Sequence, residues 1–108
     1  MVKLEEMATL VVSTDGDKLP FRIAVKSPDH LPPHAHVLDL ETGKKDLYQF
    51  ELTKAAPKIP SAIKDYKGEA TDEMKVQICK WATKKSKLFS KYTNWELLNL
   101  QWLFNKKN

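Results

Sequence analysis

Apolar and polar residues alternate along the first half of the chain. In residues 21–26, Phe21, Ile23 and Val25 share one side of an extended segment, and the residues between them share the other. This period-two pattern is typical of a half-buried β-strand. A β-branched, apolar run at residues 8–13 comes before it, and the turn formers between the two runs include an Asp-Gly pair. The pattern therefore predicts two neighbouring strands.

Two further strands are expected after a proline-rich turn. Residues 27–33 contain three prolines, which remove backbone donors and hold the residues before them in extended conformations. Residues 34–41 and 47–52 then read as strands, and the loop between them contains Gly43. The two segments predict an antiparallel hairpin.

The second half of the chain has helical spacing. Residues 61–67 are expected to form a short helix that stops at Gly68. A longer helix is expected to begin with Thr71 as N-cap, followed by two acidic residues that suit a helix N-terminus. This helix would run through the lysines at 84–91. Its predicted buried stripe consists of Met74, Ile78, Trp81, Ala82, Leu88 and Phe89.

A last helix is expected after Asn94, its predicted N-cap, and it is apolar around most of its circumference. A helix that is apolar on every side requires burial on every side, and terminal helices are seldom fully enclosed. We therefore expect this helix to contact a protein partner or a second copy of the chain. A helix wedged wholly inside the core is the alternative. The predicted contact residues are Trp95, Trp102, Leu103 and Phe104.

Strands followed by helices indicate an α+β fold, with a small antiparallel sheet of about four strands in the N-terminal half packed by two or three C-terminal helices. The length of 108 residues, without internal repeats, fits a single domain over residues 1–108. Cys79 is the one cysteine, so no internal disulfide is expected. The first residues match neither a signal peptide nor a membrane span, so we expect a cytoplasmic protein without membrane association.

Positive charge is concentrated near the C-terminus. Residues 75–108 contain eight lysines and one acid, a net charge of +7, whereas residues 1–74 contain ten basic and thirteen acidic side chains, a net charge of −3. Such a basic half suits a polyanion or an acidic protein, although lysines that only solubilise a helix are the alternative. The candidate residues for binding phosphate or nucleic acid are Arg22, Lys26, Lys84, Lys85 and Lys87.

The three histidines lie together in the segment DHLPPHAHV, residues 29–37. On a regular strand, His34 and His36 would point to the same side, roughly 7 Å apart. Two histidines at this spacing can act as the base and the acid of RNA cleavage, because imidazole titrates near pH ~6.5; His30 would orient the turn. A metal would need further ligands, so no metal or cofactor is expected. Purely structural hydrogen bonds are the alternative.

The segment from Pro20 to Leu52 resembles a small bacterial family, the domain of unknown function 4160. The match is carried by a Phe-Arg-Ile strand at residues 21–23 and by an acid-His-x-Pro-Pro-His-x-His-Val turn at residues 29–37. The resemblance implies a short α+β protein encoded beside another small domain, in an arrangement that looks like a toxin–antitoxin pair. It also implies that the histidine-rich turn is the functional centre, without indicating a reaction.

Three functions follow from these observations. The first is a toxin-like component of a two-gene module that acts on RNA through His34 and His36, with Arg22 and Lys26 holding phosphate. The second is a non-enzymatic protein-binding module, antitoxin-like or a phage-encoded inhibitor, that uses the apolar C-terminal helix. The third is a basic nucleic-acid-binding domain without chemistry.

Overall fold

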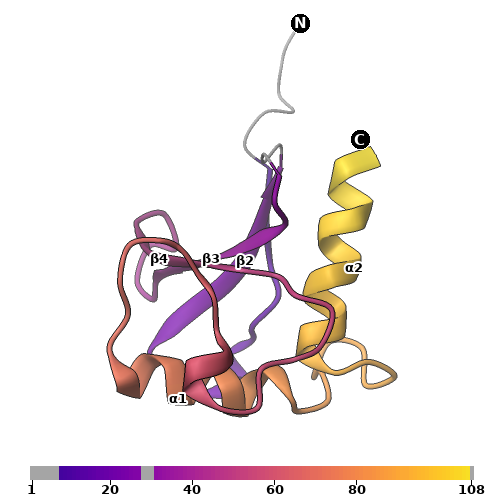
Figure 1. The fold of residues 1–108 in the computed structure, drawn as a ribbon. Coiled ribbons are helices and arrows are strands. Elements are labelled where there is room, and N and C mark those ends of the chain that lie inside the picture. Colours follow the sequence, from indigo (N-terminus) through magenta and orange to yellow (C-terminus); the bar gives the residue numbers. More distant parts are fainter. Residues whose placement is uncertain (1–7, 28–30, 108) are drawn as a thin grey trace, which may run out of the picture.

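The computed structural model describes residues 8–27 and 31–107, and the strands in this part form one antiparallel sheet in chain order (Figure 1). They are β1 (Ala8–Val11), β2 (Phe21–Ser27), β3 (His34–Asp39), β4 (Asp46–Glu51) and β5 (Asp65–Lys67). Two α-helices follow, α1 (Asp72–Ala82) and α2 (Asn94–Lys107). The short 3₁₀ turns η1 (Asp15–Asp17) and η2 (Pro60–Ala62) lie in the connections. The α+β class with strands before helices is thus confirmed.

One hydrophobic core joins the sheet to both helices. Ile23, Val37 and Phe50 from the sheet are fully buried, together with Ile78 of α1 and the nearly buried Trp95 of α2. The Trp95 ring stacks on Phe50, with 5.7 Å between ring centroids. In Figure 1, α1 lies along one end of the sheet and α2 rises beside it, where α2 packs against β2. No helix among the described residues is long and apolar enough to span a bilayer.

The prediction of a helix at residues 61–67 is wrong, because this segment contributes the fifth strand. After the single turn of η2, β5 pairs with β4. The Tyr48 hydroxyl donates a hydrogen bond to Asp65, and Lys75 Nζ of α1 lies 3.2 Å from the same carboxylate. Burial and this hydrogen bond raise the pKa of Tyr48, and the hydrogen bond from Tyr48 with the contact to Lys75 lowers the pKa of Asp65. These long-range contacts override the local helix signal.

Helix α1 also ends earlier than predicted. It stops at Ala82, so Lys84, Lys85 and Lys87 lie in the connection to α2 and not in the last turns of a helix. The Thr83 hydroxyl donates to the carbonyl of Cys79 one turn back, a local bond that competes with the helix ladder.

The connection between the helices folds back on itself. The Asn94 amide donates to the carbonyl of Lys84 and the Ser86 amide donates to the carbonyl of Tyr92, both at 2.8 Å. The buried Ser86 hydroxyl accepts from the two amides at the tip of this loop. The residues that bear those amides are Leu88 and Phe89, which are exposed rather than part of a buried α1 stripe.

The N-cap of α2 is Thr93 and not Asn94, as the sequence predicted. The Thr93 amide donates to Glu96 Oε1 at 2.8 Å, and the Glu96 amide donates to Thr93 Oγ1 at 3.1 Å. This reciprocal pair is a capping box. Asn94 is buried, and its Nδ2 donates to the carbonyl of Trp81 at 2.8 Å. Asn94 therefore fastens the start of α2 to the end of α1.

Candidate functional site: a lysine-lined cavity and a buried histidine pair

Strand β3 places His34 and His36 next to each other on one face of the sheet, as the alternation predicts. Their ring centroids are 5.2 Å apart. Their side chains are deeply buried, and the residues are 2% and 4% exposed. His36 lies opposite Ala24 of β2 and Gln49 of β4. His30, the third predicted catalytic histidine, lies outside the described residues.

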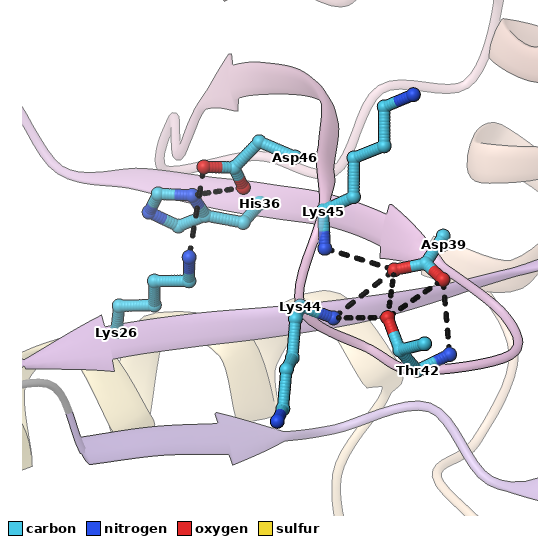
Figure 2. A network of polar contacts seen from close by, with 7 residues as sticks. All are labelled: Lys26, His36, Asp39, Thr42, Lys44, Lys45 and Asp46. Atoms are coloured by element: carbon cyan, nitrogen blue, oxygen red, sulfur yellow. Dashed lines mark hydrogen bonds and ion pairs between the residues drawn. The ribbon is translucent and has the colours of Figure 1, made fainter.

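His36 has a carboxylate partner from the next strand. Its Nδ1 lies 2.9 Å from Asp46 Oδ1, and Lys26 Nζ lies 3.5 Å from Asp46 Oδ2 (Figure 2). An ionised carboxylate can only accept, so His36 donates from Nδ1 and its ring orientation is set by Asp46. Lys26, predicted to hold phosphate, is thereby engaged within the sheet.

His34 is held by a carbonyl and two aromatic rings. Its Nδ1 lies 2.9 Å from the Pro32 carbonyl, so this nitrogen donates. Its ring stacks on Tyr66 of β5 with centroids 4.0 Å apart, and the Trp102 ring of α2 lies 5.3 Å away. A catalytic acid or base must come within about 3 Å of the proton that it moves. RNA can therefore meet this buried pair only if neighbouring groups move aside.

The described residues near His34 and His36 contain no grouped set of metal ligands. Within residues 8–27 and 31–107, no three His, Cys, Asp or Glu side chains are grouped so as to hold a metal ion. Cys79 lies in α1, and burial raises the pKa of its thiol.

Arg22 contacts a hairpin loop instead of lying free on the strand. Its Nε donates to the Leu40 carbonyl at 2.8 Å, and a second guanidinium nitrogen donates to the Glu41 carbonyl at 3.3 Å. Gly43 makes room for it, since a Cβ there would come within 3.0 Å of Arg22 Nη1, and its φ of +67° also favours glycine. The Arg22 N–H groups that donate to these two carbonyls are therefore not available to bind a phosphate.

The same loop is organised from inside by Asp39. Its carboxylate accepts the amides of Thr42, Lys44 and Lys45 at 2.9–3.0 Å, as well as the Thr42 hydroxyl (Figure 2). Hydrogen bonds from the Thr42 and Lys45 backbone are the main reason that the pKa of Asp39 is lowered. Only the backbones of Lys44 and Lys45 take part, so their side chains are dispensable here.

Three of the predicted phosphate-binding residues do come together on the surface. Lys84, Lys85 and Lys87 line a cavity of about 210 Å³ with Lys18, Lys80 and Trp81. We call this the lysine cavity. Lys80 precedes Lys84 by four residues, a spacing visible in the sequence, but nothing in the sequence pattern connects Lys18 to this group.

Trp81 holds the two walls of the lysine cavity together. Its indole N–H donates to Asp17 Oδ2 of η1 at 3.0 Å, and the Thr14 amide donates to the same oxygen at 2.7 Å. Among the described residues that line the cavity, Asp17 is the one that is acidic, and its hydrogen bonds come from neutral donors. In the part of the chain that the structure describes, none of the five lysines forms an ion pair with a carboxylate. The cavity therefore has a positive potential that favours an anion.

The predicted contact residues of α2 divide between the core and the surface. Trp95 and Trp102 are only 2% and 5% exposed, so they are core residues and not surface contacts in this chain. The Trp95 indole also donates to the Thr53 carbonyl at 2.8 Å. Leu103 and Phe104 are 55% and 65% exposed, so only the outer edge of this helix is on the surface.

A scan against protein-family models, a search of curated proteins and a search of solved structures each found no match to this chain. The resemblance to the domain of unknown function 4160 accordingly stays a prediction from residues 21–23 and 29–37.

Replacing Trp102 and Leu103 in turn tests this division of α2. Trp102→Ala should lower the free energy of unfolding by about 3–5 kcal/mol, because it opens a cavity beside His34. Leu103→Ala, the matched exposed position, should change it by less than about 0.5 kcal/mol. Urea unfolding monitored by circular dichroism measures both. A larger loss for Leu103→Ala than for Trp102→Ala would contradict the placement of the helix.

Proposed function

We propose that the protein binds single-stranded RNA through the lysine cavity and the basic surface around it. The observation that carries this proposal is the convergence of five lysines, from three segments of the chain, on one cavity in which no lysine is paired with a carboxylate of the described residues. Lysines that neutralise phosphates release condensed counterions, which drives association with nucleic acid.

The structure supports a single strand in preference to a duplex. A cavity of about 210 Å³ is a local recess, into which a flexible strand can turn a phosphate. A duplex is stiff over a persistence length of ~150 base pairs, so it offers its phosphates only along a regular convex surface. The choice of RNA rests on the toxin–antitoxin arrangement that the sequence resemblance implies.

Removing two cavity lysines should weaken RNA binding. In Lys84→Gln/Lys87→Gln, we expect the affinity for a short fluorescent single-stranded RNA to fall about tenfold or more at low salt. The dependence of log affinity on log salt should become shallower by about 1.4, at ~0.7 for each lost phosphate contact on a single strand. Fluorescence anisotropy over a salt series measures both quantities.

The control for this experiment is Lys44→Gln/Lys45→Gln, which removes the same charge from exposed side chains that do not line the cavity. Its salt dependence should stay close to that of the wild type. Equal losses in the two variants would mean that binding depends only on net charge. No binding by the wild type would overturn the proposal.

A second candidate function, RNA cleavage, is favoured by the contact between His36 and Asp46. In this scheme, His36 takes the proton from a ribose 2′-hydroxyl, whose oxygen attacks the adjacent phosphorus. The 5′-oxygen leaves and takes a proton from protonated His34, which gives a 2′,3′-cyclic phosphate and a 5′-hydroxyl. Lys26, 3.5 Å from Asp46, supplies a nearby positive charge that stabilises the charge developing on the phosphoryl oxygens.

The two candidate sites are separated along the chain segment that contains β2, since Ala24 is the middle residue of the strand and Leu19 precedes its start. His36 pairs with Ala24, whereas Leu19, five residues earlier in the chain, lines the lysine cavity. At ~3.3 Å per residue, the separation along an extended chain is roughly 16 Å. A strand held in the lysine cavity could reach the histidines only over several nucleotides.

Cleavage is tested with purified protein in EDTA. If the histidines act, the wild type should release cyclic-phosphate ends, and His36→Gln should reduce the rate by about 10²–10⁴-fold. Asp46→Asn is the second variant, because its more exposed carboxylate can be replaced with less risk to folding; it should give a smaller loss. No cleavage by the wild type, or equal cleavage by His36→Gln, would exclude this reaction and leave RNA binding untouched.

A further inference from the structure

We propose that the lysine cavity recognises the terminal phosphate of an RNA strand, a phosphate monoester, in preference to the internal diesters. This inference rests on the proposed binding of RNA and specifies which group of the RNA the cavity accepts. It follows from the shape of the cavity, from its charge and from the contact between Gly16 and Lys87.

The shape favours a group at a chain end. The cavity, at about 210 Å³, is smaller than the ~300–1,000 Å³ of sites that enclose a whole drug-sized ligand. A terminal phosphate is joined to one sugar and can enter such a recess with three of its oxygens. An internal phosphate carries a sugar on each side, so it would stay at the rim.

The charge favours the same group. A phosphate monoester carries about −1.5 to −2 charges near neutral pH, whereas a diester carries one. Five lysines line the cavity against the single carboxylate of Asp17, and none of them is paired with a carboxylate among the described residues, so the positive charge exceeds what one diester would neutralise. Lysine ammonium groups act as compact point charges with freely rotating donors, which suits a tetrahedral phosphate without fixed in-plane geometry.

The absence of a side chain at Gly16 allows Lys87 to pack against the backbone in the cavity wall. A Cβ built on Gly16 would lie 3.0 Å from Lys87 Cδ and 3.4 Å from Cε. The stem of Lys87 therefore lies directly against the backbone of η1, and both residues line the cavity. On the same side, Asp17 accepts from the Trp81 indole and the Thr14 amide and forms no ion pair with a cavity lysine among the described residues.

The test compares one RNA sequence with three kinds of end: a 5′-phosphate, a 3′-phosphate, and hydroxyl groups at both ends. For the wild-type protein, we expect a terminal phosphate to tighten binding at least about tenfold, because of its additional charge and contacts. Lys84→Gln/Lys87→Gln should lose most of this preference, whereas Lys44→Gln/Lys45→Gln should keep it. Fluorescence anisotropy at constant salt gives each affinity.

Gly16→Ala is a second and milder variant. An added methyl group would displace only the flexible Lys87 side chain, so we expect the fold to be retained. The preference for the phosphorylated RNA should fall, while the affinity for the hydroxyl-ended RNA changes little.

The outcomes separate the two proposals. If no RNA binds, the proposed function is overturned. If all three RNAs bind equally, RNA binding stands and the inference about terminal phosphates is overturned. A preference that survives in Lys84→Gln/Lys87→Gln would place phosphate recognition elsewhere and also overturn it. Adenosine monophosphate serves as competitor; if it binds as tightly as the phosphorylated RNA, the cavity takes a free nucleotide and not a chain end.

Discussion

The hydrogen bond from the Trp81 indole to Asp17 is the contact on which the arrangement of the basic surface depends. It joins the end of α1 to the loop that precedes β2, and the carbonyl of the same tryptophan accepts the side chain of Asn94 at the start of α2. One residue thus fixes three segments relative to one another. Through this bond Lys18, which follows Asp17, is placed beside the later lysines, and the Asp17 carboxylate is bound by neutral N–H donors rather than by a lysine.

The fold class could be predicted because local sequence patterns indicate strands in the first half and helices in the second. The first and last residues of several elements could not be predicted in this way. The apolar residues of β2 alternate in the sequence, so the face with Phe21, Ile23 and Val25 could be predicted from spacing, whereas the complete burial of Ala24 on the opposite face could not. Strand β5 is too short to show an alternating pattern of apolar and polar residues. Its position depends on contacts of Asp65 with Tyr48 and Lys75, which belong to other elements. Helix α1 ends where backbone bonds between residues 84 and 94 fold the chain back, although the apolar spacing continues to Phe89.

In the candidate sites, too, features set by neighbouring residues could be predicted, whereas contacts between distant parts of the chain could not. The spacing of His34 and His36 predicted a shared face, but their burial depends partly on Tyr66 and Trp102, from distant parts of the chain. Arg22 was expected to face away from the apolar side, yet its carbonyl partners belong to a loop whose position only the folded hairpin defines. A run of lysines was visible near residue 84, whereas Lys18 joins them only through tertiary structure.

We propose that the lysine cavity, and not the histidine pair, receives the nucleic acid. Amide chemical-shift perturbation during titration with a 5′-phosphorylated single-stranded RNA tests it most directly. We expect the largest shifts on residues 15–19 and 80–87, in the two walls that Trp81 joins. Shifts concentrated on His34, His36 and Tyr66, with those walls unmoved, would contradict it.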